Sequence, residues 1–189
     1  MPRPEARWRV FLAGVQWRAL RLRPWTCPLC GPALLLRLAD HEHAIRCLRC
    51  GAGAVHLSLG LALRAQRPSL RGLRVLELSS RGAWVRFLRR AGVQLTRSEF
   101  FDDVAPGQTR DGVRCEDVQR LSFADATFDL VTHTEVLEHV EDDAAGMREL
   151  RRVLAPGGLT AFTVPIDPRA ATRQRVVRGA DGALRFLQP

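Results

Sequence analysis

Two short cysteine motifs constrain the fold of the first part of this chain most strongly. Cys27 and Cys30 frame the first motif, Cys47 and Cys50 frame the second, and each motif is C-x-x-C followed by glycine. The 16 residues between them give a spacing typical of a tetrahedral zinc site with four thiolate ligands. Four thiolates leave no open coordination position, so we predict a structural zinc ion in a zinc-ribbon unit at residues 25–52. A segment this short would gain much of its folding free energy from the metal.

Disulfide bonds or unpaired cysteines are the alternatives to zinc. Disulfides require an oxidising compartment, and no signal peptide is recognisable, because the apolar stretch 10–15 is short and no small-residue cleavage site follows it. No apolar run approaches the roughly 18 residues needed to cross a bilayer, so a cytoplasmic protein is expected. His41 and His43 lie between the motifs and are expected to be exposed loop residues rather than ligands. Cys115 is expected to be buried and inert.

The formal net charge of +9 is concentrated at the N-terminal end, and all 29 basic residues are arginine. Residues 1–74 hold 13 arginines and three acids, whereas residues 75–189 hold 16 arginines and 17 acids. The basic part is therefore the expected partner surface, with RNA phosphates or the surface of a membrane as candidate partners. A coding bias towards arginine is an alternative cause of the excess.

The chain before residue 71 divides into three expected parts. Residues 1–24 alternate arginines with large apolar groups, which indicates a basic amphipathic lead-in, packed as a helix on the next domain or lying on a membrane surface. The zinc-ribbon unit follows, and then a connecting helix within residues 53–70. Pro68 and Gly72 mark the end of that helix and the start of the next domain.

From residue 71 to residue 189, strand patterns alternate with helix patterns. This alternation predicts an α/β fold with a doubly wound, mostly parallel sheet. Strands are expected at 73–78, 93–98, 113–115, 128–133 and 159–164, helices at 84–91 and 142–154, and a hairpin within 175–187.

Acidic residues stand where three of these strands end. Glu77 ends the first strand and is followed by a tight turn and a helix start, which is typical of a nucleotide-type site. Glu99 lies 22 residues later, at the end of the second strand, where an acid can accept hydrogen bonds from ribose hydroxyls. Asp117 follows the third strand. The sequence therefore predicts a nucleotide-type cofactor at this edge of the sheet.

Further motifs resemble the class I S-adenosylmethionine-dependent methyltransferases, in the type found in ubiquinone biosynthesis. They are Phe-Asp-Leu-Val at 128–131, Glu-Val-Leu-Glu-His-Val at 135–140 and the segment 148–158 that ends in Ala-Pro-Gly-Gly. The resemblance covers about residues 70–165 and implies a Rossmann-like domain that binds S-adenosylmethionine. A four-cysteine knuckle ahead of such a domain resembles a bacterial subgroup of these enzymes. Because the family usually adds two more strands, the last strands are expected to be missing and the domain at 71–189 to be incomplete.

The resemblance also implies roles for individual residues. The family's loop after the first strand is commonly Gly-x-Gly-x-Gly, whereas this chain has Ser79, Arg81 and Ala83 at those places, and side chains there keep the backbone further from a ligand. The implied cofactor residues are Glu77 for the methionine amine, Ser79 and Gly82 in the loop around the methionine part, Glu99 for the ribose, Asp117 for the adenine amino group, Val118 beside the adenine, and Thr132 and Thr134 at the mouth where the methyl group is transferred.

A general base is needed only when the methyl acceptor is protonated at the working pH. His133, at the end of the fourth strand, is the predicted catalytic base. Glu135, Glu138 and His139 follow closely and are weaker candidates, because Glu138 and His139 are expected to cap or pack a short helix.

Three functional hypotheses remain open at this stage. The first is S-adenosylmethionine-dependent methyl transfer to a small-molecule or sugar acceptor. The second is a zinc-containing RNA methyltransferase that uses its basic N-terminal part, although the cysteine motifs lack interleaved aromatics for base stacking. The third is a truncated or degenerate methyltransferase fold without turnover. Binding of S-adenosylmethionine separates the third hypothesis from the first two, and salt-dependent RNA binding tests the second.

Overall fold

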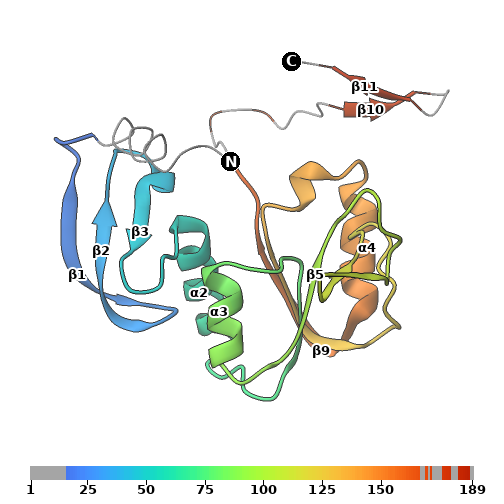
Figure 1. Ribbon diagram of the computed structural model, residues 1–189, viewed down its shortest axis with the longest axis horizontal. Helices are drawn as coiled ribbons and strands as arrows, with labels where there is room; N and C mark the ends of the chain where they lie inside the picture. The colour runs from blue at the N-terminus through green and yellow to red at the C-terminus, as the bar shows by residue number, and fades with distance from the viewer. Residues whose placement is uncertain (1–15, 167–168, 170, 172–175, 180–182, 188–189) are drawn as a thin grey trace. The chain divides into compact units, whose positions relative to one another are not determined.

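The computed structural model describes residues 16–166, 169, 171, 176–179 and 183–187, and these form two compact units (Figure 1). The first unit comprises residues 1–72 and 81–93. The second comprises residues 73–80 and 94–189. In the described part of the chain, no helix is both long and apolar enough to span a membrane.

A three-stranded antiparallel sheet carries the cysteine motifs of the first unit (Figure 1). The strands lie in the order β1-β2-β3, and both motifs begin where a strand ends, at Cys27 and at Cys47. The elements of this part are β1 (Arg21–Cys27), β2 (Gly31–Arg37), the 3-10 helix η1 (Glu42–Ala44) and β3 (Ile45–Cys47).

Strand β1 corrects part of the predicted lead-in. Residues 21–24 were expected in an amphipathic helix, but they pair with β2 from Arg21↔Arg37 onwards. Arginine and apolar residues alternate with a period of two here, which is the period of a strand, and cross-strand hydrogen bonding fixes that conformation. The rest of the predicted lead-in, up to residue 15, lies outside the described residues.

Helix α2 (Ala54–Gln66) follows the second cysteine motif and confirms the predicted connecting helix. It packs closely on the first motif through Gly60. A Cβ atom at Gly60 would stand 2.5 Å from Cδ1 of Leu29 and 3.4 Å from Pro28, so only glycine allows this approach without a shift of the neighbours. The helix therefore buttresses the loop that carries Cys27 and Cys30.

Helix α3 (Ala83–Arg90) is strongly amphipathic and groups with the first unit. It buries Trp84 and Leu88, and Arg86 Nη2 donates a hydrogen bond of 2.9 Å to the carbonyl of Cys50. The sequence analysis included this helix in the domain from residue 71, whereas the structure groups residues 81–93 with the unit that carries the cysteines.

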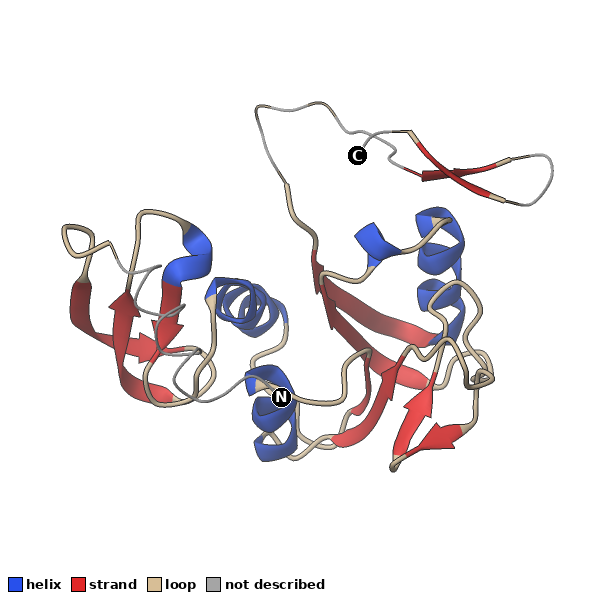
Figure 2. Ribbon diagram, turned by 45° about the horizontal axis from the view of Figure 1, so that its top comes forward, coloured by secondary structure: helices blue, strands red, loops and turns tan. Residues whose placement is uncertain are grey.

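The second unit contains a six-stranded sheet in the order β6-β7-β5-β4-β8-β9 (Figures 1 and 2). All its strands run parallel except β6, which pairs antiparallel with β7. This confirms the predicted α/β fold with a mostly parallel sheet. The strands are β4 (Arg74–Glu77), β5 (Gln94–Glu99), β6 (Thr109–Arg110), β7 (Val113–Cys115), β8 (Phe128–Thr134) and β9 (Leu154–Thr163).

The hydrophobic core of this unit lies where α4 (Asp143–Val153) packs on the sheet. The helix begins as predicted, since the Asp142 side chain accepts a hydrogen bond of 2.7 Å from the Ala145 amide. A short 3-10 helix, η2 (Leu137–His139), precedes it. The core consists of Leu76, Val118, Leu121, Phe128, Val131, Leu137, Leu150 and Val153.

Strand β9 begins five residues earlier than the predicted strand at 159–164. Phe128 of β8 pairs with Leu154, but Leu130 pairs with Leu159, so the segment 155–158 bulges out of the ladder. Gly157 has a φ of 76°, which a glycine adopts without strain. The Pro-Gly-Gly sequence therefore bends a strand here instead of only ending the preceding helix.

The predicted C-terminal hairpin is confirmed within the described residues. Strand β10 (Val176–Arg178) pairs antiparallel with β11 (Leu184–Phe186) as a separate two-stranded sheet.

Candidate functional site

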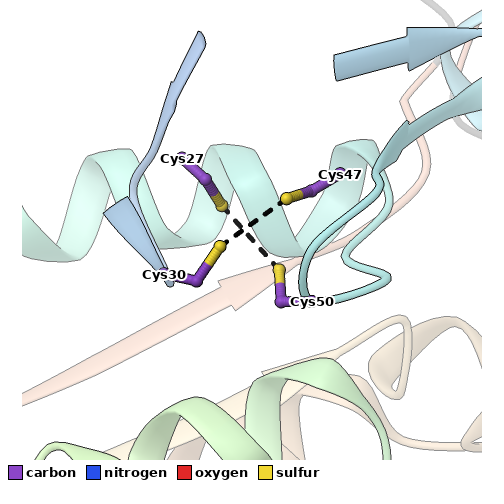
Figure 3. A group of neighbouring side chains, drawn as sticks. All are labelled: Cys27, Cys30, Cys47 and Cys50. Carbon is purple, nitrogen blue, oxygen red and sulfur yellow. Dashed lines mark hydrogen bonds between the residues drawn. The ribbon is translucent and has the colours of Figure 1, made fainter. Parts of the chain in front are cut away.

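The four cysteines of the first unit point towards one another (Figure 3). Their sulfur atoms all lie within 4.8 Å, with 3.8 Å between Cys27 and Cys50 and 3.6 Å between Cys30 and Cys47. A tetrahedral zinc ion with Zn–S bonds of about 2.3 Å requires S···S separations of about 3.8 Å. The cluster therefore has the size and ligand number for one four-coordinate ion.

Backbone amides support negative charge on this cluster. The Leu29 amide points at Cys27 Sγ at 3.4 Å. Burial acts to raise the pKa of Cys47, but hydrogen bonds from the backbone of Cys50 and Arg49 bring that pKa below its ordinary value. Burial, together with the neighbouring thiols, raises the pKa of Cys30. A bound cation would favour the thiolate in all four residues.

The other predicted metal-related residues lie outside this cluster. His41 and His43 are exposed, in agreement with the sequence analysis. Cys115 is fully buried in β7, and its Sγ lies 3.1 Å from the carbonyl oxygen of Val104.

Glu77 lies fully buried at the carboxyl end of β4. The hydroxyl of Thr132 donates to one of its carboxylate oxygens, and the hydroxyl of Ser79 donates to the other at 2.5 Å. Thr132 stands directly opposite Glu77 in the parallel register between β4 and β8. The carboxylate is therefore held from both sides at the switch point of the strand order, where open α/β sheets bind ligands.

Glu99 at the end of β5 is held in the same way. Ser80 Oγ donates to Glu99 Oε2 at 2.5 Å, and Arg97 Nη1 donates to the Ser80 carbonyl at 2.8 Å. The two consecutive serines of this loop thus each orient one of the two acids. The sequence analysis named Ser79 as a residue of the loop around the methionine part and as a departure from glycine, but it did not predict the hydrogen bonds from Ser79 and Ser80 to the two acids.

Asp117 follows β7 at the same edge of the sheet. Its Oδ1 accepts hydrogen bonds from the amide of Gln119 at 2.9 Å and from the side chain of that residue at 3.2 Å. The Glu116 amide donates to the Glu99 carbonyl at 3.0 Å, which ties the loop to β5. Val118 is buried in the hydrophobic core, so its expected position beside an adenine stays a prediction.

The remaining predicted cofactor residues, Thr134 and Gly82, lie at the end of a strand and before a helix. Thr134 is half-buried at the end of β8, and Glu135 after it has a φ of 53°, a left-handed conformation that is uncommon outside glycine. Gly82 belongs to the first unit, where it precedes α3 with a φ of 107°. A Cβ atom at Gly82 would meet open space, so its backbone conformation is what requires glycine.

The predicted base, His133, is fully buried in β8. Its ring stacks on Phe162 with 4.8 Å between centroids, and neither ring nitrogen has a hydrogen-bond partner among the described residues. Burial lowers the pKa of His133 to about 4. Because side chains alternate along a strand, His133 faces the opposite side of the sheet from Thr132.

Two residues at this edge were missed by the sequence analysis. Phe100 directly follows Glu99 and is 59% exposed, so an exposed aromatic residue stands next to this acid in the chain. Glu116 is buried and accepts hydrogen bonds from Arg114 Nε and from the Ser122 amide, so it shapes the loop that carries Asp117. The sequence could have indicated Phe100, because an aromatic residue there directly follows the acid that ends the second predicted strand.

Residues 76–162 match the family model described as a methyltransferase domain. This segment runs from within β4 to within β9 and contains all the site residues of the second unit described above.

Known proteins with similar sequences match part of the chain. A demethylmenaquinone methyltransferase of Corynebacterium urealyticum is 46% identical over 61 residues, which is 31% of this chain and 26% of the relative. A ubiquinone biosynthesis O-methyltransferase of Parvibaculum lavamentivorans is 32% identical over 74 residues, covering 39% and 29% of the two chains. The chain thus spans little more than a quarter of the length of these relatives.

Among solved structures, an S-adenosylmethionine-dependent methyltransferase from Mesorhizobium loti aligns with a TM-score of 0.45 and 27% identity. The alignment covers 67% of this chain and 62% of that one.

Proposed function

We propose that residues 76–162, which match the methyltransferase-domain model, form a domain of the class I S-adenosylmethionine-dependent type and transfer a methyl group from this cofactor to a small-molecule acceptor. One observation carries the proposal. Glu77 and Glu99 end adjacent parallel strands, and each carboxylate is held by a serine hydroxyl from the loop between them. Two fixed acids at a topological switch point suit a ligand that carries both an ammonium group and a ribose.

The residues present fit S-adenosylmethionine as follows. The Glu77 carboxylate, oriented by Thr132 and Ser79, attracts the ammonium of the methionine part. Glu99 accepts hydrogen bonds from the ribose hydroxyls. Asp117 accepts from the adenine amino group, and the exposed ring of Phe100 offers a stacking surface for the base.

The bound cofactor supplies the activated methyl group. The chain's own part is to orient the donor and the acceptor and to exclude water. The end of β8 would help to orient the cofactor. Thr132 holds the Glu77 carboxylate through a hydrogen bond, and Thr134 lies two residues further along the strand, towards the loop. His133 stays a predicted general base, which would be needed only if the methyl acceptor is protonated at the working pH.

We propose a quinone-type ring as the first acceptor class to examine. The two relatives named above act, by their names, on demethylmenaquinone and in ubiquinone biosynthesis. A ring hydroxyl or an electron-rich ring carbon would be the nucleophile. Sugars and other small molecules remain alternative acceptors, and these names give no support to RNA.

We further propose that Cys27, Cys30, Cys47 and Cys50 bind one structural Zn²⁺ ion. The S···S separations of 3.6 and 3.8 Å support tetrahedral coordination. All four positions are filled by the protein, so the ion would stabilise the first unit and take no part in the chemistry.

Calorimetry with S-adenosylmethionine, followed by an assay for S-adenosylhomocysteine, tests the proposed activity. We expect one cofactor per chain, and product only when a demethylated quinol is added. Absence of binding would overturn the proposal. Binding without turnover on quinols, phenols and sugars would instead support the hypothesis of a fold that does not turn over.

A further inference from the structure

The positive charge of the protein belongs to the first unit. Residues 1–72 and 81–93 hold 16 arginines and three acids, a formal charge of +13. Residues 73–80 and 94–189 hold 13 arginines and 17 acids, a formal charge of −4. A unit of this composition favours anionic ligands, and a specific ligand requires a shaped site within it.

The first unit contains a cavity of about 440 Å³ beside the cysteine cluster. This volume lies within the range of small-molecule sites, roughly 300–1,000 Å³. Guanidinium groups reach it from three segments, and none of the described residues that line it is acidic. The lining residues are Leu29, Cys30, Gly31, Arg49, Arg64 and Arg90.

Two of the three arginines are held in place. Arg49 Nη1 donates to the carbonyl of Cys30 at 2.7 Å and to that of Pro32 at 3.3 Å. Both hydrogen bonds are donated by Nη1 of Arg49 and involve neither its Nε nor its Nη2. The guanidinium of Arg64 lies over the Phe87 ring, 6.0 Å from its centroid. Held guanidinium groups lose less conformational freedom when they bind a ligand.

A second cavity of about 300 Å³ shares Leu29, Arg64 and Arg90 with the first. Apolar side chains contribute to its wall, among them Leu63 and Phe87. Arginines and apolar surface thus meet at the shared residues, which suits an organic molecule that carries an anionic group at one end.

We propose that the arginine-lined cavity binds the phosphate group of an organic phosphate. The guanidinium fork matches phosphate oxygens with paired, charge-assisted hydrogen bonds. The ligand is a soluble phosphate ester or a lipid headgroup, which share this chemistry. All the residues that line this cavity belong to the first unit, and none of them is a predicted residue of the methyl-transfer site.

The competing explanation is that the arginines only offset the charge of the metal cluster. Four thiolates and one Zn²⁺ carry a net charge of −2, and Cys30 belongs both to that cluster and to the cavity wall. Arginines that served the metal alone would affect zinc content without affecting phosphate binding.

The test is a calorimetric titration of the zinc-loaded full chain with pyrophosphate at fixed ionic strength. We expect Arg64→Gln and Arg90→Gln each to weaken binding about five- to tenfold, because each removes one charge-assisted contact. Arg89→Gln is the matched control, since it removes the same charge from α3 at an exposed residue outside the cavity. We expect it to bind within about twofold of the unaltered protein, because Arg89 does not line the cavity and salt screens the charge of an exposed side chain.

Equal weakening in all three variants, or none in any, would overturn the proposal. Loss of zinc from Arg64→Gln and Arg90→Gln with unchanged pyrophosphate binding would also overturn it. Vesicles of phosphatidic acid, compared with phosphatidylcholine vesicles, separate the two ligand sources. Vesicle binding that pyrophosphate displaces identifies a lipid headgroup, whereas pyrophosphate binding without vesicle binding identifies a soluble phosphate.

Discussion

Glu77 combines complete burial with hydrogen bonds from two hydroxyl groups, and so concentrates negative charge at one point of the sheet edge. The charge has a defined direction, because Thr132 and Ser79 hold the two oxygens separately. A carboxylate in such surroundings discriminates strongly between a cationic and a neutral ligand group.

We predict that Glu77→Gln weakens S-adenosylmethionine binding at least tenfold. The substitution keeps the shape of the side chain but removes the charge that attracts the ammonium. The expected loss of binding free energy is about 1.5–3 kcal/mol. Calorimetry measures the change, and thermal unfolding confirms that the variant is folded. Glu138→Gln, at an exposed acid beyond β8, is the control and should bind the cofactor normally. Comparable affinity in the two variants would contradict the assigned role of Glu77.

His133 makes the stability of the protein depend on pH. Its pKa is about 4 in the folded chain because of burial and about 6.5 when unfolded. Between these values the unfolded state binds more protons than the folded state. The contribution of His133 to the free energy of unfolding therefore falls as the pH drops from 6.5 to 4, and it is constant above pH 6.5. We predict a loss of about 3 kcal/mol over this range. Denaturant titrations at several pH values measure this loss in the unaltered chain and in His133→Phe. The variant should lack the part of the pH dependence that comes from His133.

The same variant tests the predicted base. His133→Phe replaces two unpartnered ring nitrogens with an apolar ring that can keep the contact with Phe162. If methyl transfer at neutral pH persists in this variant, His133 is not the base. A large fall in turnover with unchanged cofactor binding would support it.

Among the elements, α2 packs closely on the first cysteine motif at Gly60. Gly60→Leu should destabilise the first unit by about 1–3 kcal/mol, because the added side chain would displace Leu29 and Pro28. Ala62→Leu, on the exposed side of the same helix, should change stability by less than about 0.5 kcal/mol. Chemical denaturation of the zinc-loaded protein compares the two. Similar stabilities would mean that the helix moves freely away from the motif.

Regular elements were predictable where a single periodicity governs a long segment. The strands at β4, β5 and β8 and the helices α2, α3 and α4 follow from apolar patterns and turn residues. The bulge at 155–158 was not predictable, since its register depends on pairing with β8. Strand β1 was not predictable either. Its alternation of arginines with apolar residues is compatible with a basic helix and with a strand, and only the pairing with β2 decides between them.

The candidate site was partly predictable for a similar reason. Glu77, Glu99 and Asp117 follow from the positions where strands end. The roles of Ser79 and Ser80 depend on hydroxyl directions across neighbouring strands, which a local pattern does not contain. The opposite facing of His133 and Thr132 follows from strand alternation, so the burial of His133 was foreseeable once β8 was recognised.

At the scale of the whole molecule, the proposed zinc ion should hold only one of the two units together. We predict one zinc per chain, and loss of the fold of residues 25–52 on treatment with a strong chelator. Elemental analysis gives the stoichiometry and tryptophan fluorescence follows unfolding near Trp25. Cys27→Ser should abolish binding, and Cys115→Ser, at the cysteine outside the cluster, should retain it. Zinc bound equally by both variants would refute the assignment.

Strand β9 closes one side of the six-stranded sheet in the described part of the chain, and at 10 residues it is the longest strand there. An outermost strand presents a row of backbone donors and acceptors to any extended polypeptide that meets it. We therefore expect lateral addition at β9 to be one route of self-association at high concentration. Solubility should respond to changes along β9 more than to changes in the arginine-rich unit, whose like charges keep molecules apart.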